Sequence, residues 1–186
     1  MGHLEFPTLC IELTSPAETR DFAARLAPLL PGGILLGLSG SLGAGKTEFV
    51  RGLVVGLGSL DEVLSPTFVL ETVYTCNDSA PIRNVHHWDL YRLGGDVFEP
   101  SVFEERGRER SITLIEWPER SSEVERLLDI RILLEIPGSQ AMDSHESVER
   151  RLLSLSVRTE AAGGAGLLEA LRHDRNSISS SRGHDS

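Results

Sequence analysis

The sequence contains little cysteine and no long apolar run. Its two cysteines, Cys10 and Cys76, lie far apart and form no Cys-x-x-Cys pair, which argues against a zinc knuckle or a disulfide framework. We expect both to be buried thiols. No apolar run approaches the roughly 20 residues that a membrane-spanning helix needs, and the N-terminus lacks the basic and apolar regions of a signal peptide. We therefore expect a cytoplasmic protein with no membrane contact.

Basic residues are outnumbered, and lysine is almost missing. The 18 basic and 28 acidic residues give a formal net charge of -10, which argues against a broad surface for nucleic-acid phosphates. If RNA is involved, we expect a partner protein to hold it. Lys46 is the single lysine in a chain that otherwise uses arginine, which indicates a position where a compact point charge is needed.

The 186 residues fit one domain, because a chain of this length can bury a sizeable core. We expect a folded domain over residues 1–172. The remaining residues, 173–186, are rich in Ser, Asp and Arg, and we predict that they form a disordered tail.

Strand and helix patterns alternate along the first part of the chain. The Ser15-Pro16-Ala17-Glu18 segment is typical of a capped helix start, and the helix should run to about Leu30. A second helix is predicted over 46–57, with Gly58 ending it. The remaining predicted elements are strands at 9–13, 34–38, 68–75, 82–88, 112–117, 129–136 and 151–157, and a short helix at 166–172.

A complete phosphate-loop motif separates the strand at 34–38 from the helix at 46–57. It reads Gly40-Ser41-Leu42-Gly43-Ala44-Gly45-Lys46-Thr47. In this motif glycines let backbone N–H groups turn toward phosphate at a helix N-terminus, the lysine reaches the outer phosphates, and the Thr hydroxyl binds Mg²⁺. A strand before the motif and an amphipathic helix after it are the context that the motif requires. The sequence therefore predicts that this segment binds ATP and magnesium.

Hydrolysis also needs carboxylates near the phosphates, and two acids end predicted strands. Glu116 follows an apolar strand in the manner of a Walker B acid, and Asp89 follows the segment Val85-His86-His87-Trp88. Because side chains alternate along a strand, His87 and Asp89 share one face, while His86 and Trp88 share the other. The two adjacent histidines are therefore poorly arranged for one zinc ion, and a hydrogen-bonded structural ring is the favoured interpretation. We interpret Trp117 as a packing residue near the site.

Four segments together resemble the TsaE (formerly YjeE) family of bacterial ATPases required for threonylcarbamoyladenosine in tRNA. They are the phosphate loop 40–47, Ser65-Pro66-Thr67-Phe68, His87-Trp88-Asp89-Leu90-Tyr91-Arg92-Leu93 and Ile115-Glu116-Trp117-Pro118-Glu119. The resemblance covers roughly residues 13–171.

The resemblance implies an α/β three-layer P-loop domain with a mainly parallel, mixed central sheet. It implies that Lys46 and Thr47 bind phosphate and magnesium, that Glu116 is linked to magnesium, and that Asp89 is needed for hydrolysis. It also implies a switch-like loop at Ser65-Pro66-Thr67. The partners implied are the TsaB and TsaD proteins, which ATP hydrolysis would reset between cycles, with tRNA contacted only through that complex.

Two positions depart from the family pattern. Ser41 stands where an acid is usual, and Glu48 stands where a second Thr is frequent. The segment 96–110 also matches weakly.

Other P-loop classes remain open to different degrees. A small-molecule kinase is the main alternative, with Arg106, Arg108 and Arg110 as candidates for a phosphate-binding lid. A nucleotide-gated scaffold without useful turnover is a third class. A GTPase is excluded, because its Asn-Lys-x-Asp signature needs a lysine other than Lys46.

Overall fold

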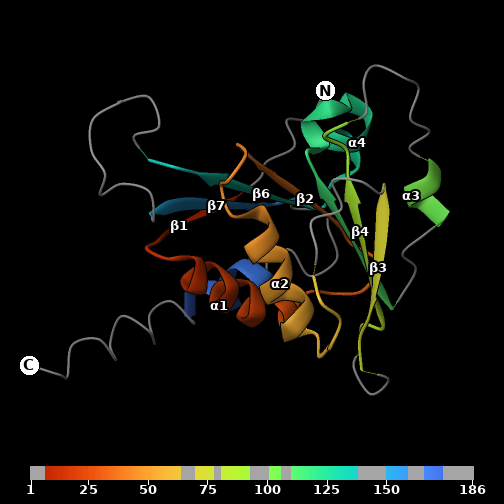
Figure 1. The fold of residues 1–186 in the computed structure, drawn as a ribbon, viewed down its shortest axis with the longest axis horizontal. Coiled ribbons are helices and arrows are strands. Elements are labelled where there is room, and N and C mark those ends of the chain that lie inside the picture. Colours follow the sequence, from red (N-terminus) through yellow and green to blue (C-terminus); the bar gives the residue numbers. More distant parts are fainter. Residues whose placement is uncertain are drawn as a thin grey trace, which may run out of the picture.

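One sheet organises the computed structural model, which describes residues 7–63, 70–77, 81–92, 101–105, 110–137, 150–158 and 166–173. Seven strands within these residues form the sheet in the order β1-β7-β6-β2-β5-β4-β3 (Figure 1). Their bounds are Thr8–Leu13 for β1, Leu35–Gly40 for β2, Glu71–Thr75 for β3, Asn84–Asp89 for β4, Ser111–Glu116 for β5, Ile130–Glu135 for β6 and Arg151–Val157 for β7.

The four central strands run parallel. β2 pairs in parallel with both β5 and β6, and β4 pairs in parallel with β5. The outer strands reverse direction, since β7 is antiparallel to β6, β1 to β7, and β3 to β4. Parallel neighbours require crossover connections, which is why helices lie against the faces of this sheet. The predicted mixed, mainly parallel sheet is confirmed.

Helix α1 spans Pro16–Leu26 and begins as its sequence predicts. The Ser15 hydroxyl accepts the backbone N–H of Glu18 at 3.1 Å, and Pro16 occupies the first turn, where no N–H is needed. The α-helix stops earlier than predicted and continues as a 3₁₀ turn, η1, over Ala27–Leu29. Pro28 explains this difference, because it lacks the N–H that would continue the α-helical pattern.

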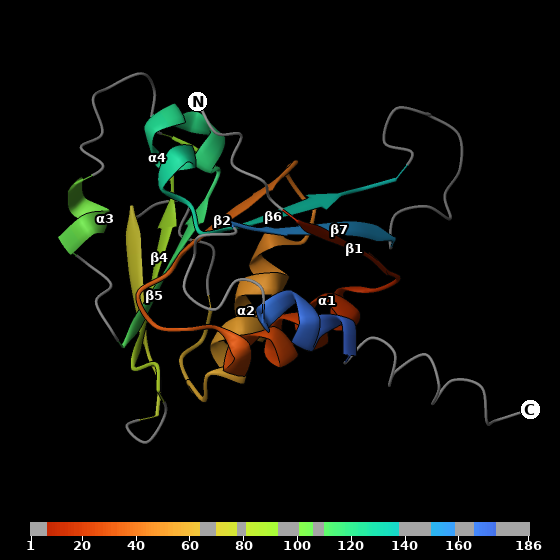
Figure 2. The ribbon, with the colours of Figure 1, turned by 180° about the vertical axis from the view of Figure 1, so that it is seen from behind.

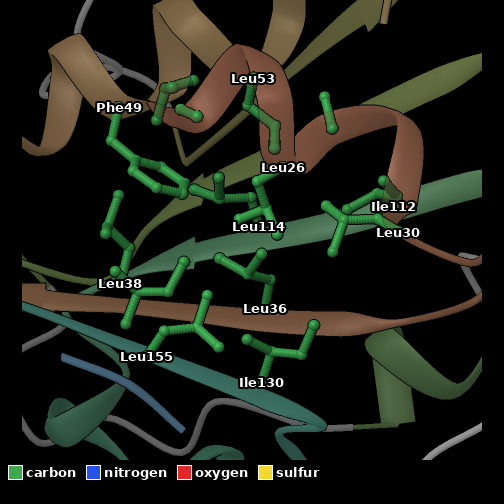
Figure 3. Close-up of a cluster of buried hydrophobic side chains, with 14 of the residues drawn as sticks. Leu26, Leu30, Leu36, Leu38, Phe49, Leu53, Ile112, Leu114, Ile130 and Leu155 are labelled. Atoms are coloured by element: carbon green, nitrogen blue, oxygen red, sulfur yellow. The ribbon is translucent and has the colours of Figure 1, made fainter. Parts of the chain in front are cut away.

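Three helices in the described part of the chain cover one face of the sheet. α1, α2 (Lys46–Gly56) and the helix at 166–173 lie together there, as Figure 2 shows from behind, with the last helix in blue. Between helices and sheet lies the larger hydrophobic core, in which Leu26, Phe49 and Leu53 meet Leu36 and Leu114 (Figure 3). Each of these side chains is fully buried, so the core fixes α2 firmly against β2, the strand that precedes it.

The helices α1 and α2 approach each other at two glycines. A side chain at Gly52 would overlap the backbone of Arg20, and one at Gly56 would overlap that of Ala24. These glycines lie four residues apart and therefore on one side of α2. The two helices consequently meet backbone to backbone along this line.

Shorter helices cover the opposite face, which completes a three-layer arrangement. They are α3 (Ser101–Glu105), the 3₁₀ turn η2 (Pro118–Arg120) and α4 (Ser122–Leu127). A second, smaller core joins Phe103 and Val124 to Trp88 and Ile115 of the sheet. The sequence pattern did not predict α4, since no helix is expected between the strands at 112–117 and 129–136. Its start is nevertheless capped, since the Ser121 hydroxyl accepts the N–H of Val124.

Other sequence predictions have separate outcomes. The predicted last helix is present over 166–173, one residue longer than expected, whereas 174–186 lies outside the described residues. Cys76 is buried as predicted, but the prediction for Cys10 is wrong, because that thiol is exposed on edge strand β1. None of the helices in the described part of the chain is long and apolar enough to cross a membrane.

Candidate nucleotide site

The phosphate-loop segment links β2 to α2 and has the backbone of a tight glycine-rich turn. Gly40, Gly43 and Gly45 all have positive φ angles, of 145°, 78° and 105°. At Gly40 the need for glycine is also steric, since a side chain there would overlap the carbonyl oxygen of Leu134. Gly45 is the N-cap of α2, so the first N–H groups of that helix have no intrahelical partner. The segment therefore offers backbone donors and the positive end of a helix dipole to an anion.

Lys46 lies in the first turn of α2 and folds back over the loop. Its Nζ donates to the carbonyl oxygens of Gly40 at 2.8 Å and Ser41 at 3.1 Å. Burial lowers the pKa of Lys46, while the nearby carboxylates of Glu116, Glu119 and Asp89 act in the opposite direction. A buried ammonium that is held by loop carbonyls and faces three carboxylates is a strong point charge for anion binding.

The two predicted acids end adjacent strands. β4 and β5 are parallel, and their register pairs Asp89 directly with Glu116. Glu116 is only 3% exposed, whereas Asp89 is half-buried. Burial raises the pKa of Asp89, as does the charge of Glu116, whereas the Tyr91 N–H that Asp89 Oδ1 accepts at 2.8 Å lowers it. The structure thus brings both acids to the same edge of the sheet as the phosphate loop.

A buried histidine supports Glu116. His87 is fully buried, and its Nε2 lies 2.9 Å from Glu116 Oε1, while its Nδ1 lies 3.4 Å from the hydroxyl of Tyr74. Burial, reinforced by the charge of Glu116, raises the pKa of Tyr74 to about 12, so the phenol stays protonated. The interpretation of His87 as a hydrogen-bonded structural ring is confirmed. Its contact with Oε1 fixes the orientation of the Glu116 carboxylate.

Two aromatic side chains, Trp117 and Tyr91, also line the site. Lys46 Nζ lies 4.0 Å from the ring centroid of Trp117, and the rings of Trp117 and Tyr91 are 5.0 Å apart. Trp117 has a left-handed backbone, with φ of 56°, and its N–H donates to Leu38 O at 3.2 Å. Such a conformation costs on the order of 1–2 kcal/mol for a residue other than glycine. The sequence pattern predicted only a packing role for Trp117 and no role for Tyr91. Both residues lie within two positions of a predicted acid, and this proximity is the signal that could have identified them.

These groups enclose one cavity of about 290 Å³. That volume is near the lower end of ligand pockets, which span roughly 300–1,000 Å³. The residues that line it come from the loop and α2, from the end of β4 and from the end of β5; they are Leu42, Gly43, Gly45, Lys46, Thr47, Glu48, Asp89, Tyr91, Glu116 and Trp117. Seven of the ten predicted site residues thus lie around a single space, while Gly40, Ser41 and Ala44 belong to the loop that frames it.

The donor set fits magnesium better than a transition metal. Within the described residues no group of three or more His, Cys, Asp and Glu side chains is placed to hold a metal ion. Mg²⁺ does not need such a group, because one or two protein oxygens, phosphate oxygens and water complete its octahedral shell. Thr47 and Glu116 both line the cavity and offer hard oxygen ligands of this kind.

Other predicted features have mixed outcomes. Ser65-Pro66-Thr67, Arg106 and Arg108 lie outside the described residues. Arg110 precedes β5 and donates to Pro81 O at 3.3 Å, so it lies at the opposite edge of the sheet from Glu116. β5 separates the two edges by roughly 16 Å at about 3.3 Å per residue, and this distance argues against Arg110 as part of a kinase lid.

Glu48 occupies a position where the resembled family frequently has Thr. Its carboxylate pairs with Arg20 of α1 and with Arg51 of α2. Arg51 also donates from Nε to Val63 O at 3.2 Å, at the end of the described segment 7–63. Glu48 therefore acts as a link between the two helices beside the cavity.

Comparisons with known proteins agree on one family. A family model described as "Threonylcarbamoyl adenosine biosynthesis protein TsaE" matches residues 13–146. A protein of Streptomyces coelicolor named tRNA threonylcarbamoyladenosine biosynthesis protein TsaE is 41% identical over 119 residues, which cover 63% of this chain and 77% of that protein. A protein of the same name from Aquifex aeolicus is 38% identical over 123 residues, covering 65% of this chain and 85% of that one. The crystal structure of Bacillus subtilis YdiB is similar with a TM-score of 0.66 at 25% identity, over 91% of this chain and 98% of YdiB.

Proposed function

Because this chain belongs to the TsaE family of threonylcarbamoyl adenosine biosynthesis proteins, we propose that it is the magnesium-dependent ATPase subunit of tRNA threonylcarbamoyladenosine modification. In this proposal residues 1–172 form the ATPase domain, and ATP hydrolysis resets a complex of TsaB and TsaD between cycles. The observation that carries it is the convergence of Lys46, Thr47, Asp89 and Glu116 on one cavity.

Phosphate binding falls to the loop in this proposal. The N–H groups at the start of α2 and the Lys46 ammonium hold the β and γ phosphates, and Lys46 exchanges its contacts with loop carbonyls for phosphate oxygens. Because the lysine is already buried beside the loop, little reorganisation is needed. The Trp117 ring beneath Nζ confines the ammonium to this position.

The carboxylates divide the remaining work. Bound Mg²⁺ would neutralise charge that develops on the phosphates, and Thr47 and Glu116 would hold it. The contact with His87 keeps the Glu116 carboxylate in one orientation. Asp89 is more accessible than Glu116 and has a raised pKa, and it orients the attacking water and accepts its proton.

The charge of the chain supports a division of labour with partners. A net charge of -10 gives little attraction for tRNA, so TsaB and TsaD contact the tRNA in this proposal. Hydrolysis by the isolated chain is expected to be slow, and productive turnover to require the partners. By linkage, a partner that prefers the ATP-bound form raises the affinity for ATP by the same factor.

The test measures phosphate release and repeated tRNA modification by purified TsaB and TsaD, with and without this chain. We expect both to depend on the chain and on magnesium, and the Lys46→Ala variant to support neither. A binding titration against TsaB–TsaD in an ATP analogue and in ADP measures the gating directly. Equal affinities in the two nucleotides would reject gating, and repeated modification without the chain would reject the function.

A further inference from the structure

Arg151 is the first residue of β7, and the topology brings it to the phosphate loop. β7 runs antiparallel to β6, with Leu152 paired to Glu135 at the end of β6. β6 is parallel to β2, and Gly40 at the end of β2 pairs with Leu134. The beginning of β7 therefore lies at the sheet edge from which the loop emerges, although more than 100 residues separate the two in sequence.

The guanidinium of Arg151 contacts two consecutive carbonyl groups of the loop. Its Nε donates to Ala44 O at 2.9 Å, and its Nη2 donates to Gly43 O at 3.2 Å. Hydrogen bonds from a charged donor are stronger than neutral ones, and the rigid fork of arginine suits two neighbouring acceptors. The side chain is half-buried, and it is a described residue that does not line the cavity. Arg151 thus holds the loop by hydrogen bonds to its backbone, on the side away from the cavity.

These two hydrogen bonds restrict the backbone conformation of the loop. A trans peptide is planar, so its N–H points away from its C=O, and a donor fixed on Ala44 O turns the Gly45 N–H to the opposite side. Gly43 and Gly45 both have positive φ, and glycine residues have wide conformational freedom. The loop needs an external contact to keep the donors of a phosphate nest in place, and Arg151 provides it while adding a positive charge behind the loop.

We infer that Arg151 is a positioning residue of the nucleotide site, which fixes the Gly43-Ala44-Gly45 backbone for phosphate binding. The inference rests on the proposed function, since it requires that the loop bind a nucleotide. It adds a residue that the family match over residues 13–146 does not reach. Arg151 does not touch the phosphates itself; it acts through the backbone that does.

The test compares three variants of the full chain by calorimetric titration with ADP and with a non-hydrolysable ATP analogue, both with magnesium. Arg151→Met removes the donors and keeps an unbranched side chain, while Arg151→Lys keeps the charge but not the fork. Arg150→Met is the matched control, because Arg150 is the exposed neighbour and its side chain pairs with Glu12 of β1 at 3.6 Å. Thermal unfolding of each variant accompanies the titrations.

Arg151→Met is expected to raise the Kd of both nucleotides on the order of tenfold, the size expected for losing charge-assisted hydrogen bonds. Arg151→Lys should restore part of this loss, and Arg150→Met should bind as the wild type does. With purified TsaB and TsaD, KM for ATP should rise while kcat stays within about threefold, because the Asp89 side of the cavity is untouched. A protein that is merely less stable would show a lower Tm without this split.

Binding by Arg151→Met at wild-type affinity overturns the inference, and so does equal weakening by Arg150→Met. If Arg151→Met does not fold, the decision falls to Arg151→Lys, for which wild-type affinity again overturns it. The wild-type titration separates the two hypotheses. If the wild type binds no nucleotide, the proposed function fails and this inference with it; if it binds and Arg151→Met binds equally well, only the inference fails.

Discussion

The two halves of the candidate site are built in opposite ways. The loop half is eight consecutive residues that present backbone groups and one lysine, and its tip is open to solvent, with Leu42 83% exposed. The acid half consists of two side chains that are distant in sequence, and the paired ends of β4 and β5 bring them together. Its supporting residue, His87, is fully buried. One half is therefore a local motif, while the other depends on correct strand pairing.

The largest effect is expected in the loop half, from Lys46→Ala. The variant should lose ATP turnover on the order of 10²–10³-fold, because a preorganised charge at the developing phosphate charge is lost. No other lysine exists to replace it. Phosphate release in the presence of TsaB and TsaD measures the loss, and circular dichroism should show an intact fold. Normal turnover in a folded variant would contradict the assignment of the loop to phosphate binding.

The acid half should separate into two roles on substitution. Asp89→Asn is expected to lower kcat on the order of a hundredfold with little change in nucleotide affinity, because it removes the group that positions and deprotonates water. Glu116→Gln is expected to weaken magnesium-dependent binding first. Magnesium titrations of nucleotide affinity, together with single-turnover hydrolysis, distinguish the two. Unchanged kinetics in both variants, or identical defects, would contradict this division.

A smaller effect on nucleotide binding is expected from His87, which contacts Glu116 and does not line the cavity. His87→Gln should reduce magnesium-dependent binding roughly tenfold, the lower end of effects seen when a supporting partner of a metal ligand is changed. Tyr74→Phe is the matched control, because it removes the hydroxyl that lies 3.4 Å from His87 Nδ1 and leaves the 2.9 Å contact between His87 and Glu116. Its binding should stay within about threefold of wild type. Equal loss in both variants would indicate a packing effect instead.

The smallest effect concerns stability and pH. Burial raises the pKa of Asp89 in the folded chain, so the folded state binds that proton more tightly than the unfolded state. The stability from this proton is fully present below the unfolded pKa and is lost as pH rises through the folded pKa. Asp89→Asn keeps an acceptor for Tyr91 N–H and should therefore melt slightly higher than wild type at pH 7, with the difference vanishing below about pH 4. A wild type that melts higher at pH 7 would contradict the sign.

The same comparison explains what the sequence could predict. The start of α1 and the phosphate loop are local patterns. Ser15 is a typical helix cap, and the glycines are typical of a backbone with positive φ angles. Strand alternation also predicted correctly that His87 lies on the face opposite Trp88, since His87 contacts Glu116 whereas Trp88 joins the second core. These features depend on neighbours within a few residues.

Features that depend on distant pairing were not predictable in this way. The alignment of Asp89 with Glu116 follows from the register of β4 and β5. The contact of Arg151 with the phosphate loop follows from the antiparallel pairing of β7, which is distant from the loop in sequence. No local pattern at Arg151 distinguishes it from Arg150. The exposed position of Cys10 was missed for a similar reason, because only the sheet order makes β1 an edge strand.

The glycine contact between α1 and α2 limits how this protein can be varied. The atoms nearest to Gly52 and Gly56 are backbone atoms of Arg20 and Ala24, which no compensating substitution can make smaller. If these two positions are randomised, almost all active clones should carry glycine at both. The exposed side of α2, for example at Val55, should accept many residues. Exchanging α2 for the helix of a relative should therefore succeed only when both small positions are transferred, since they set the distance at which α1 holds the helix that carries Lys46.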